Sequence, residues 1–242
     1  MARISKIIEL FIFIFLLALL IYFDPAGITR RISEFLRLKY PASVRDPKLL
    51  IYASAYIGGL AAKSGLLAVI AAVSMIQKRD LADIFALRMP SSHKWLKGIA
   101  PFLILCIAIR LFYSRNPLVQ NLAVNSVFPE TVIAGNIIIA LSALLLSPIV
   151  EELIFRGYIF DVIQKSFGAG FAVVAASAAF TLAHAPQPNF GILDLAVMFG
   201  FGIIFGVARY KTGSVLAPVI FHSLYNSVYA AVGLAGFHIL GY

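Results

Sequence analysis

Apolar runs about as long as a membrane-spanning helix recur along the chain, and they constrain its fold more than any other feature. The clearest cover 7–23, 49–76, 99–112 and 215–240. A helix that crosses a bilayer needs about 20 apolar residues. Of the 242 residues, 61% are hydrophobic and 13% charged, whereas soluble domains carry about 25% charged residues. The sequence therefore excludes a water-soluble enzyme and a disordered chain, and predicts an integral membrane protein.

About seven membrane helices account for these runs, because seven spans of about 20 residues use roughly 140 residues and leave enough for loops. The remaining spans lie within 132–167, 171–185 and 195–210. Lipid-exposed backbone must satisfy its own hydrogen bonds. The predicted fold class is therefore all-α, a polytopic transmembrane helical bundle. No internal repeat or linker divides the chain, so we expect a single membrane domain.

The basic residues lie mostly between the apolar runs. Lys and Arg number 20 against 11 Asp and Glu, which gives a net charge of +9. Positive loops are typical of the cytoplasmic side of membrane proteins, so the predicted partner is the lipid bilayer and not a nucleic acid. The segment 24–48 contains six basic residues around apolar ones and is predicted to lie in the headgroup layer. Placing 77–97 in the cytoplasm suits the other loops but leaves the side of 24–48 open.

Three polar clusters lie inside apolar runs, where a charge at mid-span costs roughly 2.5–3.5 kcal/mol. They are Glu151, Glu152 and Arg156; Phe180 and His184; and His222 and Asn226. Residues four apart share a helix face, so Arg156 is predicted to pair with Glu152 and to leave Glu151 free to hold a water. A fourth polar residue, Lys63, is predicted simply to face a polar cavity or a neighbouring helix.

Counting from the turns places the three clusters at similar depth. About 16 residues separate the turn at 168–170 from the two glutamates before it and from His184 after it, or roughly 24 Å. From the turn at 212–213, His222 and Asn226 lie roughly 14 and 20 Å from the same membrane face. The helices are thus predicted to bring two carboxylates, two imidazoles and one amide into one intramembrane pocket. Separate interhelical hydrogen bonds are the alternative.

Such a group of side chains suits peptide hydrolysis, which needs a base for the attacking water and donors for the oxyanion. Glu151 is the candidate base, and His184 positions the water or protonates the leaving amine. His222 and Asn226 polarise the scissile carbonyl. Two histidines and a glutamate also bind Zn²⁺ with an open position for water. Because no His-Glu-x-x-His motif is present, we expect no cofactor, and a zinc-dependent metalloprotease is the alternative.

The ordered motifs Glu-Glu-x-x-x-Arg, Phe-x-x-x-His and His-x-x-x-Asn resemble those of the CPBP family, the CAAX-protease and bacteriocin-processing proteins that are also called Abi. The resemblance covers roughly 134–232 and includes the approach to the last motif, 209–218. It implies a helical intramembrane endopeptidase with a metal-independent glutamate mechanism. It assigns the catalytic glutamate to Glu151, the water-positioning histidine to His184, the oxyanion contacts to His222 and Asn226, and support of the site to Glu152, Arg156 and Phe180.

The resemblance also divides the membrane domain into variable N-terminal helices, 1–130, and a catalytic core, 131–242. The expected substrate is a membrane-associated protein cut near its end, either a prenylated CAAX protein or one with a leader or tail. The expected location is the inner membrane of a prokaryotic cell. Two other functions stay open: a non-enzymatic bacteriocin-immunity or signalling scaffold, and a small transporter that uses the pocket as a proton relay.

Overall fold

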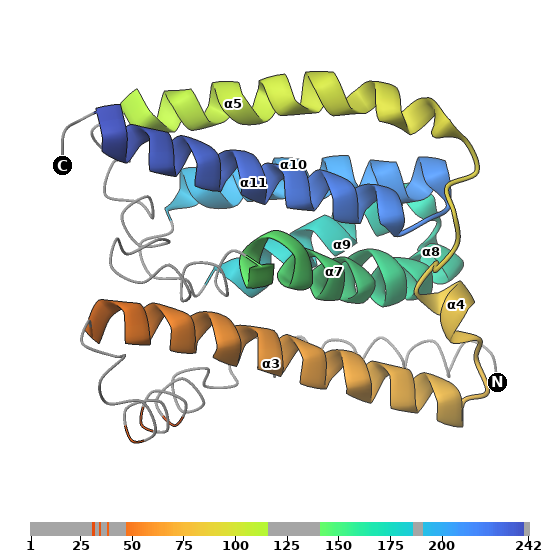
Figure 1. Cartoon of the computed structure of the whole chain (residues 1–242). Helices are drawn as coiled ribbons and strands as arrows, with labels where there is room; N and C mark the ends of the chain where they lie inside the picture. Colours follow the sequence, from red (N-terminus) through yellow and green to blue (C-terminus); the bar gives the residue numbers. More distant parts are fainter. Residues whose placement is uncertain are drawn as a thin grey trace. The chain divides into compact units, whose positions relative to one another are not determined.

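Helices make up the regular structure of the described residues in the computed structural model (Figure 1). The structure describes 47–115, 141–185 and 191–239, together with Arg31, Glu34 and Leu38. No strand occurs among these residues, which confirms the all-α fold class. The predicted span 7–23 and nearly all of the predicted interfacial segment 24–48 lie outside the described residues.

The helices follow the predicted order. The longest helices of the described residues are α3 (Pro47–Ile76), α5 (Ile99–Arg115), α9 (Ala169–His184), α10 (Ile192–Thr212) and α11 (Leu216–Ile239). Between α5 and α9, one helical stretch alternates between π and α pitch. It consists of the π-helical segment η3 (Ser142–Leu146), α7 (Ser147–Glu152), the π-helical segment η4 (Leu153–Ile159) and α8 (Phe160–Phe167). The spans therefore end within a few residues of the predicted positions.

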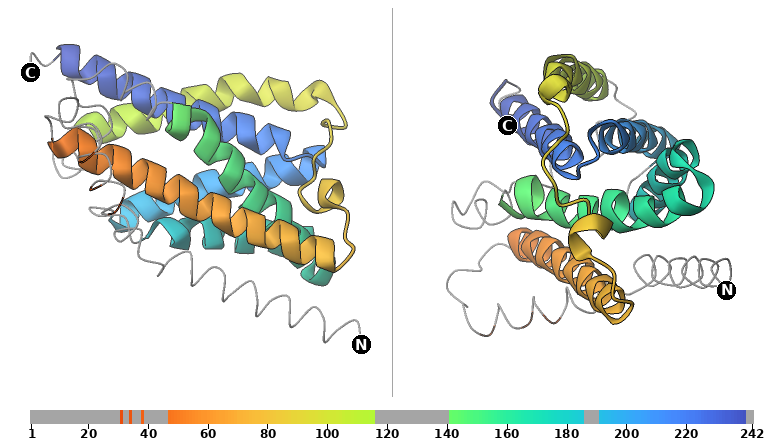
Figure 2. Two further views of the ribbon diagram at one scale, coloured as in Figure 1. Left: turned by 60° about the horizontal axis from the view of Figure 1, so that its bottom comes forward. Right: turned by 90° about the vertical axis from the view of Figure 1, so that its right-hand side faces the viewer.

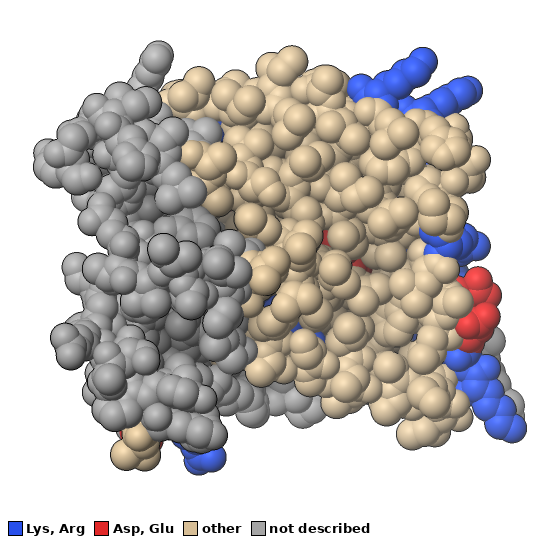
Figure 3. All heavy atoms as spheres, viewed as in Figure 1, with Lys and Arg blue, Asp and Glu red and all other residues tan. Residues whose placement is uncertain are grey.

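Three described stretches are long and apolar enough to cross a membrane: Gly58–Ile76, His93–Phe112 and Ile192–Thr212. The apolar helix Ala169–His184 is shorter. Large apolar side chains along these helices are exposed, as expected where lipid takes the place of a protein core. The face drawn in Figure 3 agrees, because most of its described surface carries no charge and the larger groups of charged atoms lie at its edges.

The segment 77–97, predicted as a basic loop, contains two short helices instead. Asp80 begins α4 (Leu81–Ile84) because its carboxylate accepts a hydrogen bond from the backbone N–H of Ala82 at 2.8 Å, a typical N-cap. The second is the 3₁₀ helix η1 (His93–Gly98). Between them, the Arg88 carbonyl accepts a hydrogen bond from the hydroxyl of Ser214. This serine therefore serves to hold the segment.

The predicted turns between helices are confirmed at two glycines with positive φ. Gly168, at φ 85°, separates α8 from α9, and Gly213, at φ 68°, ends α10. Only glycine adopts such angles without a steric cost. Two turned views in Figure 2 show how sharply the chain reverses between α8 and α9.

The described chain divides into two compact units, each made of segments that are far apart in sequence. The first contains 63–98, 149–185 and 191–222, and the second 47–62, 99–115, 141–148 and 223–239. The core of the first unit lies where η4, α8 and α9 meet, around the buried Phe155, Phe160 and Phe180. The division of the chain near residue 130 that the family resemblance implies stays a prediction.

Helices α9 and α10 pack closely because glycines face the contact. A Cβ atom added to Gly202 would lie 3.0 Å from Cβ of Ser177, and one added to Gly206 would lie 3.2 Å from Cγ1 of Val173. Gly202 and Gly206 are four residues apart on one face, the small-xxx-small pattern of membrane helix pairs. The close approach also brings the Gly202 carbonyl within reach of Arg156.

Substitution of Gly202 by alanine is expected to destabilise the protein. The added methyl group must push against the backbone of α9, and overpacking of this kind costs about 1–3 kcal/mol. The matched control is Gly200→Ala on the same helix, because nothing lies within 4 Å of a Cβ atom there. Thermal unfolding in detergent should show a lower midpoint for Gly202→Ala alone. Equal midpoints would mean that the glycine contact does not limit the packing.

Candidate active site

Two adjacent glutamates at the end of α7 form the centre of the candidate site. Glu151 and Glu152 are 3% and 0% exposed, and neighbouring residues of a helix point about 100° apart. Their side chains therefore meet different partners. The π-helical segments η3 and η4 lie on either side of this six-residue stretch of α-helix, and such segments are frequent at functional sites.

Glu152 is neutralised by Arg156, as the spacing predicts. Nη1 of Arg156 lies 2.9 Å from Oε1 of Glu152, and both side chains are fully buried. Nη2 donates to the carbonyl of Gly202 at 3.2 Å. The guanidinium also lies 4.5 Å from the ring centroid of Phe180 and 5.3 Å from that of Phe205, a favourable cation–π arrangement. The ion pair is thus fixed within aromatic surroundings.

His222 contacts the same carboxylate from α11. Its Nδ1 lies 2.9 Å from Oε1 of Glu152, and because an ionised carboxylate only accepts hydrogen bonds, Nδ1 carries the proton. The ring stacks on Phe205 with a centroid separation of 5.1 Å and an interplanar angle of 21°. These contacts direct Nε2 of His222 toward Glu151, at 3.9 Å from Oε2.

His184, the last residue of α9, approaches Glu151 from another side. Its Nδ1 lies 2.7 Å from the carbonyl oxygen of Phe180, which can only accept, so Nδ1 is again the protonated nitrogen. Nε2 of the neutral ring is then an acceptor, and it lies 3.6 Å from Oε2 of Glu151. The ring of Phe180 packs 4.6 Å from the imidazole, so this aromatic residue supports the site as the motif predicts.

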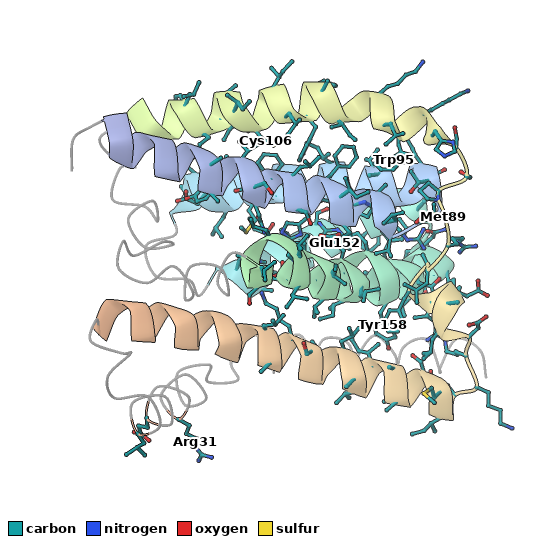
Figure 4. The ribbon with its side chains drawn as sticks, in the orientation of Figure 1. Arg31, Met89, Trp95, Cys106, Glu152 and Tyr158 are labelled. Carbon is teal, nitrogen blue, oxygen red and sulfur yellow. The ribbon has the colours of Figure 1, made fainter. Side chains whose placement is uncertain are left out.

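The contacts thus join five polar residues and Phe180, whereas Asn226 has a different contact, described below. The five are Glu151, Glu152, Arg156, His184 and His222. Figure 4 labels Glu152 among the polar atoms that gather beside α7. The separations of 3.6 and 3.9 Å between Glu151 and the two imidazoles exceed direct hydrogen bonds. A water molecule beside these atoms can contact all three of them. The arrangement can therefore position a water next to a carboxylate.

One prediction about Glu151 is wrong. The sequence suggests that Arg156 leaves this carboxylate free, but Oε1 of Glu151 forms an ion pair with the ammonium group of Lys63 on α3. Sequence reasoning could not find the pair, because the residues are 88 positions apart. The sequence did contain one indication of a role for Lys63, because it is a charged residue inside an apolar span. Charges there cost free energy on insertion and are commonly functional.

Asn226 lies one turn beyond His222 on α11, and the structure gives it a contact of its own. Its side-chain amide donates to the carbonyl of Ala143 in η3 at 2.8 Å. In the same way, Nε of Arg209 donates to the carbonyl of Arg156 in η4 at 2.9 Å. Each π-helical segment thus has a carbonyl that a side chain from another helix satisfies. The contact of Asn226 with an oxyanion stays a prediction.

A second charged cluster lies in the same unit, outside the site. Nζ of Lys165 lies 2.7 Å from Oδ2 of Asp161, which confirms the predicted i, i+4 pair, and Nη2 of Arg79 lies 3.1 Å from the same oxygen. The Lys165 side chain is 55% exposed. In the described part of the chain, no group of three His, Cys, Asp or Glu side chains is arranged to hold a metal ion.

Comparison with known families agrees with this geometry. Residues 133–228 match the Rce1-like family, described as type II CAAX prenyl endopeptidase Rce1-like. This match confirms the predicted resemblance to the CPBP family. The Rce1-like stretch contains the predicted site residues from Glu151 to Asn226, whereas Lys63 precedes it. The match supports a CAAX-type intramembrane protease in general, and with the apolar helices it indicates an integral membrane protein.

A curated relative is similar over part of its length. An uncharacterized 24.3 kDa protein of Escherichia coli is 32% identical over 97 residues, which are 39% of this chain and 44% of the relative. The chain therefore spans less than half the length of this relative. No solved structure matches the chain.

Proposed function

We propose that this protein is an intramembrane endopeptidase that hydrolyses a peptide bond near the end of a membrane-associated protein, using a water molecule activated by Glu151. The substrate is a prenylated CAAX protein or a protein with a leader or tail. The observation that carries the proposal is the position of Glu151, whose Oε2 faces Nε2 of both His184 and His222. The Rce1-like match supports the same reaction class.

The protonation of His184 defines how the water is held. With its proton on Nδ1, toward the Phe180 carbonyl, the neutral ring accepts a hydrogen bond at Nε2. The water donates one proton toward Oε2 of Glu151 and the other toward this nitrogen. Its lone pairs then point away from both groups, toward the carbonyl carbon of a bound peptide. Glu151 takes the first proton as the water attacks.

The later steps use the same residues. Attack produces a tetrahedral oxyanion, which needs donors at about 3 Å. The amide of Asn226 is one donor, and His222, whose Nδ1 is held by Glu152, is the other when its Nε2 also carries a proton in this step. The proton that Glu151 removed from the water then passes to the leaving amine, directly or through His184. The products are a carboxylic acid and an amine, so that the water is consumed in full.

The charges of the site favour this chemistry inside a membrane. Lys63 and Arg156 offset Glu151 and Glu152, so the group is close to neutral while both histidines are neutral. A neutral group costs less to bury than separate charges. We place the protein in the inner membrane of a prokaryotic cell, with a substrate that reaches the site from the bilayer.

The test compares cells that contain the wild-type protein with cells that contain Glu151→Gln. Membrane peptides are isolated, and their ends are sequenced by mass spectrometry. New ends that require Glu151 support the proposal, and ends that persist in the variant contradict it.

A parallel assay with purified protein in liposomes adds a zinc chelator. Loss of cleavage with the chelator would assign the reaction to a zinc-dependent enzyme, and restoration by added Zn²⁺ would exclude damage by the chelator.

Two substitutions of His184 test separately what each of its two ring nitrogens does. In His184→Asn, the amide nitrogen takes the place of Nδ1 but nothing replaces Nε2. We expect kcat to fall by roughly 10²-fold or more, since general acid–base groups contribute about 10²- to 10⁴-fold. His184→Gln places an amide near Nε2 and should keep more activity. Full activity of His184→Asn in the liposome assay would exclude water positioning by Nε2.

A further inference from the structure

Lys63 is the polar residue of the site that no motif predicts. It lies on α3, before the Rce1-like stretch, and its ammonium forms an ion pair with Oε1 of Glu151 on α7. The Lys63 side chain is 25% exposed and that of Glu151 is 4% exposed. The lysine therefore enters the site from its edge, while the carboxylate is enclosed.

We propose that Lys63 is a positioning residue for the reaction. Its ammonium keeps Glu151 ionised and holds Oε1 toward α3, so that Oε2 is the oxygen that faces the water. This inference rests on the proposed role of Glu151 as the base, and it adds to the family motifs a residue from the N-terminal helices.

The geometry supports the orienting role. A carboxylate that is free to rotate presents either oxygen to its surroundings, whereas an ion pair to one oxygen defines the other. With Oε1 on Lys63, Oε2 lies 3.6 Å from Nε2 of His184 and 3.9 Å from Nε2 of His222. Positioned catalytic groups depend on such supporting contacts.

The charges support the ionising role. Among the residues that the structure describes, Glu151 is faced by Lys63 from α3, His184 from α9 and His222 from α11, with Glu152 next to it along the chain. Arg156 also attracts Glu151, but its ion pair is with Glu152, whereas the ion pair of Glu151 is with Lys63. A buried carboxylate beside a second carboxylate takes up a proton readily unless a cation is close. A protonated Glu151 cannot accept a proton from water.

A structural explanation is also possible: a lysine inside a span needs an anion, whatever the anion does. The two explanations differ in what happens to Glu151 when Lys63 is replaced. If the lysine acts only in folding, folded variants keep an ionised Glu151. If it acts on the carboxylate, Glu151 takes up a proton at a higher pH than in the wild-type protein in every folded variant that lacks the cation.

The protonation of Glu151 can be measured without a substrate. Dicyclohexylcarbodiimide enters membranes and reacts with protonated carboxyl groups, and mass spectrometry of the peptide that contains Glu151 and Glu152 locates the label. The full-length protein in liposomes is compared with Lys63→Met, Lys63→Gln and Lys63→Arg. The control is Lys165→Met, which removes the cation of an ion pair outside the site. Size-exclusion chromatography and thermal unfolding identify the folded variants.

In the wild-type protein we expect little label on Glu151 at neutral pH. Lys63→Met and Lys63→Gln should move the pH of half-maximal labelling upward by about one unit or more, as loss of a close opposite charge does. Lys63→Arg should restore the wild-type profile, and Lys165→Met should not change it. Glu152, held by Arg156 and His222, is the internal reference and should stay unlabelled throughout. An unchanged Glu151 profile in a folded Lys63→Met or Lys63→Gln variant would overturn the inference.

Cleavage of a farnesylated peptide with a CAAX end is measured on the same samples. Lys63→Met is expected to lower kcat by roughly 10- to 100-fold at neutral pH, with KM within about twofold and partial recovery at higher pH. If the wild-type protein cleaves and needs Glu151 to do so, but labelling of Glu151 is the same with and without Lys63, only the positioning role is refuted. The opposite outcome is that labelling of Glu151 depends on Lys63, but the protein cleaves neither this peptide nor any cellular membrane peptide. That outcome would uphold the electrostatic effect and refute the proposed function.

Discussion

Glu151→Gln is expected to remove cleavage almost completely, with a fall in kcat of about 10³-fold or more. The amide has nearly the size of the carboxylate and still accepts a hydrogen bond from Lys63. It does not accept a proton from the water, and this step is the one that the carboxylate is proposed to perform. A loss of this size corresponds to about 4 kcal/mol of transition-state stabilisation. The measurement is kcat and KM of the purified variant in liposomes.

Two further variants make this result specific. Asp161→Asn removes a carboxylate that also pairs with cations, but outside the site, and should keep wild-type kcat. Glu151→Asp keeps the charge on a side chain shorter by one methylene, and should retain more activity than Glu151→Gln. A fall in kcat below tenfold for a folded Glu151→Gln protein would exclude this residue as the base.

Arg156→Met is expected to cause the largest loss of stability, about 3–5 kcal/mol, because it leaves a buried carboxylate without its cation. Arg156 and Glu152 are both fully buried and lie 2.9 Å apart. The arginine also donates to the carbonyl of Gly202 on α10. Its removal therefore breaks polar contacts with α7 and α10. The measurement is the free energy of unfolding in mixed micelles, from a denaturant titration.

The double variant Arg156→Met with Glu152→Gln separates the charge effect from lost packing. With both charges removed, part of the stability should return, since replacing a whole buried ion pair costs far less than breaking it. Lys165→Met is the matched surface control, with an expected cost below about 1 kcal/mol for a partly exposed pair. Equal stability of the single and double variants would show that the charge of Glu152 is not what makes Arg156 necessary.

Features that depend on the geometry of a single helix were predictable from the sequence. The span ends follow from where apolar runs stop, and α3 and α10 end as expected because turns and glycines mark them. The Glu152–Arg156 pair follows from a spacing of four residues. The common depth of Glu151 and His184 follows from the rise per residue and from a turn at Gly168. These inferences need only the geometry of a single helix and the hydrophobic length of a bilayer.

Contacts between distant parts of the chain were not predictable in the same way. The positions of Lys63 and Glu151 in the sequence do not indicate that the two side chains meet. Their helices are separated by many residues, and neither segment by itself determines how the two helices pack. The π-helical segments were missed for a related reason. In η4 the carbonyl of Arg156 accepts a hydrogen bond from Arg209, and this partner comes from another helix.

The sequence by itself determined that this protein is an all-helical membrane protein with carboxylates and imidazoles placed inside its spans. Apolar length and helical periodicity are local properties, and they leave few alternatives in lipid. The tertiary structure decided which partner each polar group has. Burial makes an unpaired charge costly, so every ionised group must find a partner wherever packing brings one within reach. For Glu151 that partner is a lysine from another helix, and the two oxygens of the carboxylate thereby have different neighbours.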